Sequence, residues 1–343
     1  MTFAGIHMKQ QVQEIKALFN SPKKVVITTH INPDGDALGS SLGLCHFLRM
    51  QGHDARIVSP TNYPDFLKWL PGNDYILHYP IAKARSQQLV NEADIVFCLD
   101  FNNLTRIGEL GHYIHQCGAK KIVIDHHQQP DDFADILISD TAASSTSELI
   151  YVLMEEWEGL KYLNQNIAVC LYTGILTDTG AFQYPATTSR VHDITSNLIA
   201  KGVQVNDVYQ RIYNSFTENR LRLFGYCITE KMKVFPELKT AYIALTQDDL
   251  VKFNVQSGDT EGLVNFPLKI ADINFSTLIS DRTEIIKLSF RSKGSFDVNQ
   301  FSRSHFSGGG HVNASGGGLK LKLDEVIEKF EITIPTYKNQ LDY

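Results

Sequence analysis

The first half of the chain alternates short apolar runs with segments of helical spacing. Four continuous, largely β-branched runs predict buried strands: Lys24 to Thr29, Ala55 to Ser59, Ala93 to Leu99 and Lys121 to Ile124. Five segments have helical spacing: Met8 to Phe19, Ala37 to Gln51, Leu110 to Cys117, Ser147 to Trp157 and Asn164 to Thr177. Buried strands joined by helices predict an α/β fold whose parallel sheet is covered on both faces.

The pattern changes near Val191. Val191 to Ala200 and Val205 to Tyr226 predict polar helices, and Thr240 to Leu245, Ile270 to Ile279 and Glu284 to Arg291 predict strands. A glycine-dense segment, Ser307 to Gly318, follows them. We therefore expect a larger α/β domain over residues 1–200, a helical connector over 201–232 and a smaller α+β domain over 233–343.

Composition and charge narrow the class of protein. The 343 residues include 32 Lys plus Arg against 38 Asp plus Glu, a formal charge of −6 that argues against a duplex-coating protein. The 5 cysteines form no CxxC pair, so neither a disulfide framework nor a zinc-thiolate site is expected. No signal-peptide pattern or membrane-length apolar run is present, which predicts a soluble cytoplasmic protein.

Acidic and histidine residues follow the predicted strands. Because ligands of open α/β sheets bind beyond the carboxyl ends of the strands, three such groups should meet at one edge of the sheet. A fourth group could join them from the end of a helix. The groups are His30 with Asp34 and Asp36, then Asp100, then Asp125-His126-His127, and lastly Asp178.

These residue types favour a site for two divalent metal ions. Four clustered carboxylates would repel one another, and their charge of −4 would balance two divalent ions if the histidines were neutral. Carboxylate and imidazole ligands without thiolate suit Mn²⁺, or less well Mg²⁺, although zinc remains possible. Taken singly, an aspartate after a strand could be a helix N-cap, and paired histidines could simply be solvated. Their combination in this order favours the metal site, which suits phosphoryl transfer.

The same residues carry a resemblance to a known family. HINPDGDALGS, from His30 to Ser40, resembles the first motif of the DHH phosphoesterase superfamily, and Asp125-His126-His127 matches the motif that names it. Asp100 and Asp178 stand where the second and fourth motif aspartates are expected. GGGH, from Gly308 to His311, and the following small residues resemble the DHH-associated domain.

The resemblance implies a role for each residue. It assigns one Mn²⁺ to His30, Asp34 and Asp100, and a second to Asp36, Asp100, His126 and Asp178, so that Asp100 bridges both ions. A metal-bound water or hydroxide would attack the phosphorus, and His127 would face the scissile phosphate. Asp125 would orient the histidine motif. Arg106 matches a recurrent arginine of the family, although a surface ion pair would explain it equally well.

The C-terminal domain is expected to bind the other end of the substrate, across a cleft from the metals. Glycines such as Gly308, Gly309 and Gly310 let backbone N–H groups approach a phosphate or a base. Arg291 and His311 are the side chains we expect to contact the distal phosphate or nucleotide. A flexible linker is the alternative interpretation of the glycine run.

Overall, the chain resembles the bifunctional oligoribonuclease and pAp phosphatase group of that superfamily. The implied activity is release of 5′-mononucleotides from short RNA, or of the 3′-phosphate from adenosine 3′,5′-bisphosphate (pAp). A RecJ-like single-strand exonuclease, a linear or cyclic dinucleotide phosphodiesterase, a polyphosphatase and a non-catalytic nucleotide sensor remain alternatives. We expect no binding of duplex DNA or membranes, and a homodimer is possible at the level of the family.

Overall fold

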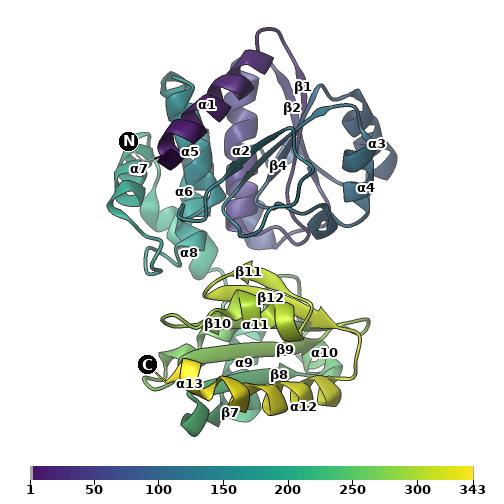
Figure 1. The fold of residues 1–343 in the computed structure, drawn as a ribbon, viewed down its shortest axis with the longest axis vertical. Coiled ribbons are helices and arrows are strands. Elements are labelled where there is room, and N and C mark those ends of the chain that lie inside the picture. The colour runs from purple at the N-terminus through teal and green to yellow at the C-terminus, as the bar shows by residue number, and fades with distance from the viewer. Residues whose placement is uncertain (1–2, 343) are drawn as a thin grey trace. The chain divides into compact units, whose positions relative to one another are not determined.

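The computed structural model of the protein describes residues 3–342 and divides into two compact units (Figure 1). The first unit reaches to Ser215, and the second begins at Phe216. Each unit has its own sheet and its own apolar cores. Within residues 3–342, no helix combines the length and the apolar character needed to cross a membrane.

The N-terminal unit contains a parallel sheet with the strand order β3-β2-β1-β4-β5-β6. Its strands are β1 (Lys24–Thr28), β2 (Asp54–Ser59), β3 (Ile76–His78), β4 (Ile95–Leu99), β5 (Lys120–Asp125) and β6 (Ile136–Ser139). The order reverses direction between β1 and β4, and open α/β sheets bind their ligands at such a switch point. The predicted α/β fold with a parallel sheet is confirmed.

Helices cover both faces of this sheet, as Figure 1 shows. One face carries α1 (Phe3–Leu18), α2 (Gly35–Met50), α5 (Thr146–Glu156) and α6 (Gln165–Asp178), with α7 (Ser189–Ala200) and α8 (Val205–Tyr213) beyond them. The other face carries α3 (Lys83–Glu92) and α4 (Glu109–Gln116). Strand β1 illustrates the alternation, because Val25 and Ile27 enter the first core and Val26 enters the second.

Glycines bring α2 and α6 into backbone contact. Gly35, Gly39 and Gly43 recur at every fourth position of α2 and so lie on one face of the helix. A Cβ atom at Gly39 would lie 2.5 Å from the carbonyl oxygen of Cys170 on α6, closer than real contacts allow. This close packing fixes the start of α2, with Asp36, against the end of α6, with Asp178.

The C-terminal unit is an α+β structure built on a mixed sheet, in the order β11-β12-β10-β9-β8-β7. Its strands are β7 (Met232–Phe235), β8 (Thr240–Leu245), β9 (Phe275–Asp281), β10 (Ile286–Ser292), β11 (Gly309–His311) and β12 (Ala314–Leu319). Its helices are α9 (Glu218–Tyr226), α10 (Gln247–Lys252), α11 (Val298–His305), α12 (Leu323–Thr333) and α13 (Lys338–Leu341). Aromatic side chains dominate one core, including Phe275, Phe290, Phe301 and Phe330.

The structure corrects the prediction for residues 205–226 and decides between the two interpretations of the glycine-dense segment. The helix predicted over 205–226 is two helices, α8 and α9, because the hydroxyl of Thr217 accepts a hydrogen bond from the N–H of Arg220 and begins a new helix. The glycine-dense segment forms β11 and β12, and β12 pairs with β10 from Ala314 to Leu319. The linker alternative is therefore wrong.

Candidate metal centre

The first group of candidate ligands lies where β1 leads into α2. His30 is 8% exposed, and its Nε2 atom lies 3.9 Å from Oδ2 of Asp34 and 3.4 Å from Oδ2 of Asp100. Asp34 is the N-cap of α2, because its Oδ1 accepts hydrogen bonds from the N–H groups of Asp36 and Ala37. The cap uses Oδ1 and therefore leaves Oδ2 facing His30.

The second group surrounds the ring of His126, which follows β5. The Nε2 atom of His126 lies 3.2 Å from Oδ2 of Asp178, 3.5 Å from Oδ1 of Asp100 and 3.9 Å from Oδ2 of Asp36. Asp178 is the last residue of α6, so the fourth group does join from the end of a helix. Asp100 directs Oδ2 to His30 and Oδ1 to His126, and it therefore lies between the two groups.

Backbone carbonyl groups orient both histidine rings. Nδ1 of His30 lies 2.9 Å from the carbonyl oxygen of Ile31, and Nδ1 of His126 lies 3.2 Å from that of Ala143. A carbonyl oxygen can only accept, so each Nδ1 carries the proton and donates. Each Nε2 then faces the carboxylates as the nitrogen able to bind a metal, an arrangement common among metal-ligating histidines.

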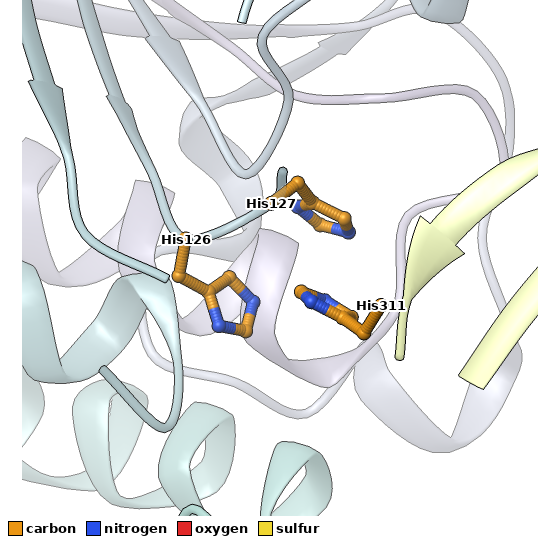
Figure 2. A group of neighbouring side chains, drawn as sticks. All are labelled: His126, His127 and His311. Carbon is orange, nitrogen blue, oxygen red and sulfur yellow. The ribbon is translucent and has the colours of Figure 1, made fainter. Parts of the chain in front are cut away.

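His127 has a different partner from His126, although the two rings are only 5.0 Å apart (Figure 2). The Nδ1 atom of His127 lies 2.7 Å from Oδ1 of Asp125, and the other oxygen of Asp125 accepts the backbone N–H of His127. Asn102 donates to the carbonyl oxygens of His127 and Gln128. Asp125 thus orients His127, and Asn102 fixes the loop.

Burial and mutual repulsion shift the pKa values of the carboxylates apart. Burial, together with the charge of Asp100, raises the pKa of Asp36 to about 7. Burial also raises the pKa of Asp178 well above its usual value. Burial would do the same at Asp100, but hydrogen bonds from His126 and His30 hold the pKa of its carboxyl well below the usual range.

This donor set fits divalent cations. Three clusters each bring their ligand atoms within 4.8 Å of one another: His30 with Asp34 and Asp100, Asp36 with His126 and Asp178, and Asp100 with Asp125 and His127. Oxygen and imidazole ligands without thiolate suit Mn²⁺ or Mg²⁺. Positive charge at this place would also offset the burial and the mutual repulsion that raise the pKa values of Asp36 and Asp178.

The beginning of α5 holds two of these carboxylates, a contribution that the sequence analysis missed. The backbone N–H groups of Thr146 and Ser147 each donate to one oxygen of Asp36, over 2.6 and 2.9 Å. The Thr146 hydroxyl lies 3.0 Å from Oδ1 of Asp100. These groups stand in the first turn of α5, where N–H groups lack helical partners and favour anions. The only sequence signal is the Ser-Thr-Ser-Glu run at the start of the predicted helix.

Arg106 lies close enough to the centre to act on its histidines. Burial, together with the positive charge of Arg106, lowers the pKa of His127. At His30, burial and the same charge act against Asp100 and Asp34, which raise the pKa of that histidine. Within residues 3–342, no carboxylate forms an ion pair with the guanidinium group of Arg106.

The predicted substrate-binding residues of the C-terminal unit lie on two strands and the segment before β11. Arg291 belongs to β10, where it pairs across the ladder with Ala314 of β12. Gly309, Gly310 and His311 form β11, and Gly308 precedes it. At Gly308 a Cβ atom would lie 2.0 Å from the carbonyl oxygen of Gly316, so this position requires glycine. The segment is an ordered part of the sheet.

Known proteins match the chain over nearly its whole length. Residues 24–175 match the DHH family, N-terminal domain, and residues 238–334 match the DHHA1 domain. The bifunctional oligoribonuclease and PAP phosphatase NrnA of Bacillus subtilis is 29% identical over 91% of this chain and 93% of its own length. The protein of the same name from Thermus thermophilus is 30% identical over 89% of this chain and 87% of its own.

A solved structure is also similar. It is an exopolyphosphatase-related protein from Bacteroides fragilis, 41% identical, with a TM-score of 0.92 and 98% of both chains covered. The sequence relatives and this structure agree in extent, because each spans both units of the chain.

Proposed function

This chain belongs to the DHH family and carries a DHHA1 domain, and from that premise we propose that it is a two-metal phosphoesterase acting on short RNA and pAp. The products would be 5′-mononucleotides from oligoribonucleotides and a free phosphate from the 3′ position of pAp. The observation that carries the proposal is Asp100, which presents one carboxylate oxygen to each of two ligand groups. A carboxylate placed in this way can bridge two adjacent ions, as a two-metal site for phosphoryl transfer would use it.

We assign the ligands from this geometry. One ion would be held by His30, Asp34 and Asp100, and the other by Asp36, Asp100, His126 and Asp178. Mn²⁺ is the proposed metal, with Mg²⁺ as a substitute. Two such ions supply a nucleophilic hydroxide near neutral pH and neutralise charge on the phosphate.

The protein's own residues would then position the substrate and the protons. Asp125 holds Nδ1 of His127, so Nε2 is the ring nitrogen that would contact the scissile phosphate or the leaving oxygen. Arg106 would add positive charge near the same phosphate. The oxygens of Asp36 accept N–H groups of α5, which keeps that ligand from rotating.

The C-terminal unit would bind the far end of a short substrate. The supporting features are the Arg291 guanidinium, which suits a phosphate, His311, and the backbone N–H groups of Gly308, Gly309 and Gly310. A requirement for a bound end would restrict the enzyme to short chains. Location in the cytoplasm and assembly into a homodimer stay predictions.

One second candidate has a specific observation behind it. The similar structure from Bacteroides fragilis is called exopolyphosphatase-related, so inorganic polyphosphate must be tested as a substrate. The cyclic-di-AMP phosphodiesterase GdpP of Bacillus subtilis, 24% identical over 94% of this chain and 49% of its own length, gives similar support to hydrolysis of cyclic dinucleotides. RecJ-like cleavage of single-stranded DNA and a sensor role have no comparable support.

The test is product analysis with Mn²⁺ on matched substrates. We would offer pAp, an RNA dinucleotide, polyphosphate and a single-stranded DNA of about 20 nucleotides, a length that favours enzymes with extended strand-binding tracks. The expected result is rapid release of mononucleotides and cleavage of pAp, with the DNA slow. Faster hydrolysis of DNA or of polyphosphate than of the RNA dinucleotide and pAp would overturn the proposal. So would the absence of hydrolysis of all four substrates.

Asp100→Asn is the matched inactive control for this assay. It keeps the size of the side chain but removes the charge that both ligand groups share. Turnover of every substrate should fall at least about a thousandfold, because both metals lose a ligand at once. Near wild-type activity in this variant would contradict the two-metal assignment.

A further inference from the structure

A cavity of about 350 Å³ opens beside the metal centre in the N-terminal unit. It lies past the carboxyl ends of β1, β2 and β3, on the side of the sheet covered by α3 and α4. Pro60 follows β2, Tyr79 and Pro80 follow β3, and all three line it. It thus shares the sheet edge that carries the candidate metal ligands, where ligands of open α/β sheets bind.

The walls of the cavity are apolar and firmly held. Ile107 and Leu110 are almost completely buried, and Tyr79 is 4% exposed, whereas Ile31 is 36% exposed at the opening. The Tyr79 hydroxyl accepts a hydrogen bond from Gln87 of α3. The backbone N–H of Ile31 donates to the carbonyl oxygen of Arg106 over 2.8 Å. Preformed apolar walls of this kind suit a flat ring.

One pair of charged groups lies at the cavity. Nζ of Lys83, at the beginning of α3, lies 2.6 Å from Oε1 of Glu109, at the beginning of α4. Both side chains are about half exposed. Together they offer a hydrogen-bond donor next to an acceptor. Every nucleobase carries a complementary acceptor and donor on its Watson–Crick edge, and protein side chains commonly read that edge in single-stranded substrates.

The cavity and the metal centre are joined through consecutive residues. Ile31 follows the candidate ligand His30, and Ile107 follows Arg106. The backbone hydrogen bond from Ile31 to Arg106 holds these two segments together at the end of the sheet that carries the candidate metal ligands, where the phosphate is proposed to bind. A nucleoside attached to a phosphate at the metal centre would therefore have an apolar cavity beside it, at the same edge of the sheet.

We propose that this cavity binds the nucleobase of a nucleotide whose phosphate occupies the metal centre. The ring would lie against the exposed side chains of Ile31 and Pro80, over the buried Tyr79 and Ile107, with its polar edge toward Lys83 and Glu109. The inference rests on the proposed function. It assigns the nucleobase of the substrate to this cavity of the N-terminal unit. Since the charged pair can serve any base edge, binding should tolerate all four bases.

The test combines two variants with substrates that lack one base. Ile31→Ala removes part of the wall, and Lys83→Met removes the charged donor while keeping an unbranched side chain. Each variant is assayed on an RNA dinucleotide and on the two dinucleotides in which one nucleoside is abasic. Mn²⁺ content is measured for every variant.

We expect both variants to raise KM for the intact dinucleotide about five- to twentyfold, with a smaller change in kcat, as loss of stacking and edge contacts predicts. On one of the two abasic substrates the variants should match the wild type, because the lost contacts have no partner there. That substrate also identifies which nucleoside enters the cavity. Equal losses on all three substrates, or no loss on any, would overturn the proposal.

A matched control is available at the opposite edge of the sheet. Lys24 forms an exposed ion pair of 2.9 Å with Glu92, so Lys24→Met removes the same kind of charge at the amino end of β1. It should leave KM for all three dinucleotides unchanged. If the wild type hydrolyses none of the dinucleotides, the proposed function fails and this inference with it. If it hydrolyses them and the variants behave like Lys24→Met, the cavity proposal alone fails.

Discussion

Thr146 shows how much of the metal centre depends on a residue that is not itself a candidate ligand. Its hydroxyl group donates to Asp100, and its backbone N–H donates to Asp36. Asp100 also has a φ of +63°, an uncommon conformation for a residue other than glycine, so its backbone is held in place by the surrounding structure.

We predict that Thr146→Val weakens Mn²⁺ binding and lowers kcat, each by about tenfold or more, the usual effect of losing a hydrogen bond to a metal ligand. Valine keeps the shape of threonine but cannot donate, whereas Thr146→Ser keeps the hydroxyl group and should retain most of both properties. Titration calorimetry with Mn²⁺ and steady-state kinetics would measure the effect. A valine variant that binds Mn²⁺ like the wild type would show that the contact is unimportant.

The shifted pKa values predict how metal binding depends on pH. Burial would lower the pKa of His126, but the hydrogen bond to Asp100 and the charge of Asp178 raise it well above its usual value. The pKa of Asp36 is raised to about 7. Without metal, the stability that protonated His126 contributes is present below about pH 6.5 and is lost as pH rises through the raised pKa. Protonated Asp36 likewise contributes stability that is lost between about pH 4 and pH 7.

Since a metal must displace these protons, Mn²⁺ should bind more tightly as pH rises. We expect the increase in melting temperature on adding Mn²⁺ to be larger at about pH 8 than at about pH 6, measured against a chelator at each pH. The difference should shrink in Asp36→Asn, which cannot lose that proton. An increase of the same size at both pH values would contradict the prediction.

At this scale the sequence predicts the positions of the candidate ligands but not their supports. His30, Asp100 and His126 could be placed at the sheet edge because each follows a strand that a continuous apolar run predicts. The contact between Thr146 and Asp100 spans 46 positions in the chain, and it depends on where α5 packs. No local pattern reports a contact of that kind.

At the scale of elements, the contact between α2 and α6 determines where Asp36 and Asp178 stand. A Cβ atom at Gly174 would lie 1.9 Å from Oγ of Ser147 and 2.7 Å from Oδ1 of Asp36. A Cβ at Gly39 would meet the backbone of α6 instead. Neither position can accept a side chain unless the helices move apart.

We predict that Gly39→Ala lowers the free energy of unfolding by about 1–3 kcal/mol, the usual effect of overpacking, and weakens Mn²⁺ binding as well. Gly225→Ala is the matched control, since Gly225 lies in α9 and a Cβ there would have nothing within 4 Å. The control should be neutral or more stable by up to about 1 kcal/mol, from helix propensity alone. Urea denaturation measures both; equal effects would refute the packing argument.

Element prediction succeeded for strands with a continuous apolar run and for helices with a long segment of helical spacing. Strands β1, β4 and β5 and helices α2, α5 and α6 lie within a few residues of their predicted bounds. The sequence analysis missed β3 and β6, which have only 3 and 4 residues, because such short runs show too little alternation. The glycines of β11 and β12 disfavour strands by propensity, and pairing with β10 overrides that preference.

At the scale of the whole molecule, the two units have separate cores, and every proposed metal ligand belongs to the first unit. We therefore predict that Mn²⁺ slows amide hydrogen exchange in β1, β4 and β5 but leaves β8, β9 and β10 nearly unchanged. Mass spectrometry of peptides after exchange, with and without Mn²⁺, would show this. Equal protection in both sheets would mean that metal binding stabilises the two units as one cooperative body.

The glycine contact between α2 and α6 also has a consequence for the choice of ion. Two backbones in direct contact cannot slide or separate easily, so the gap between the carboxylates at the ends of these helices has a set width. Calcium needs oxygen ligands at about 2.3–2.6 Å and more of them, whereas magnesium takes them at about 2.0–2.1 Å. A gap that resists widening favours the smaller ion, so we expect the three glycines of α2 to favour Mg²⁺ over Ca²⁺ although none of them offers a ligand atom.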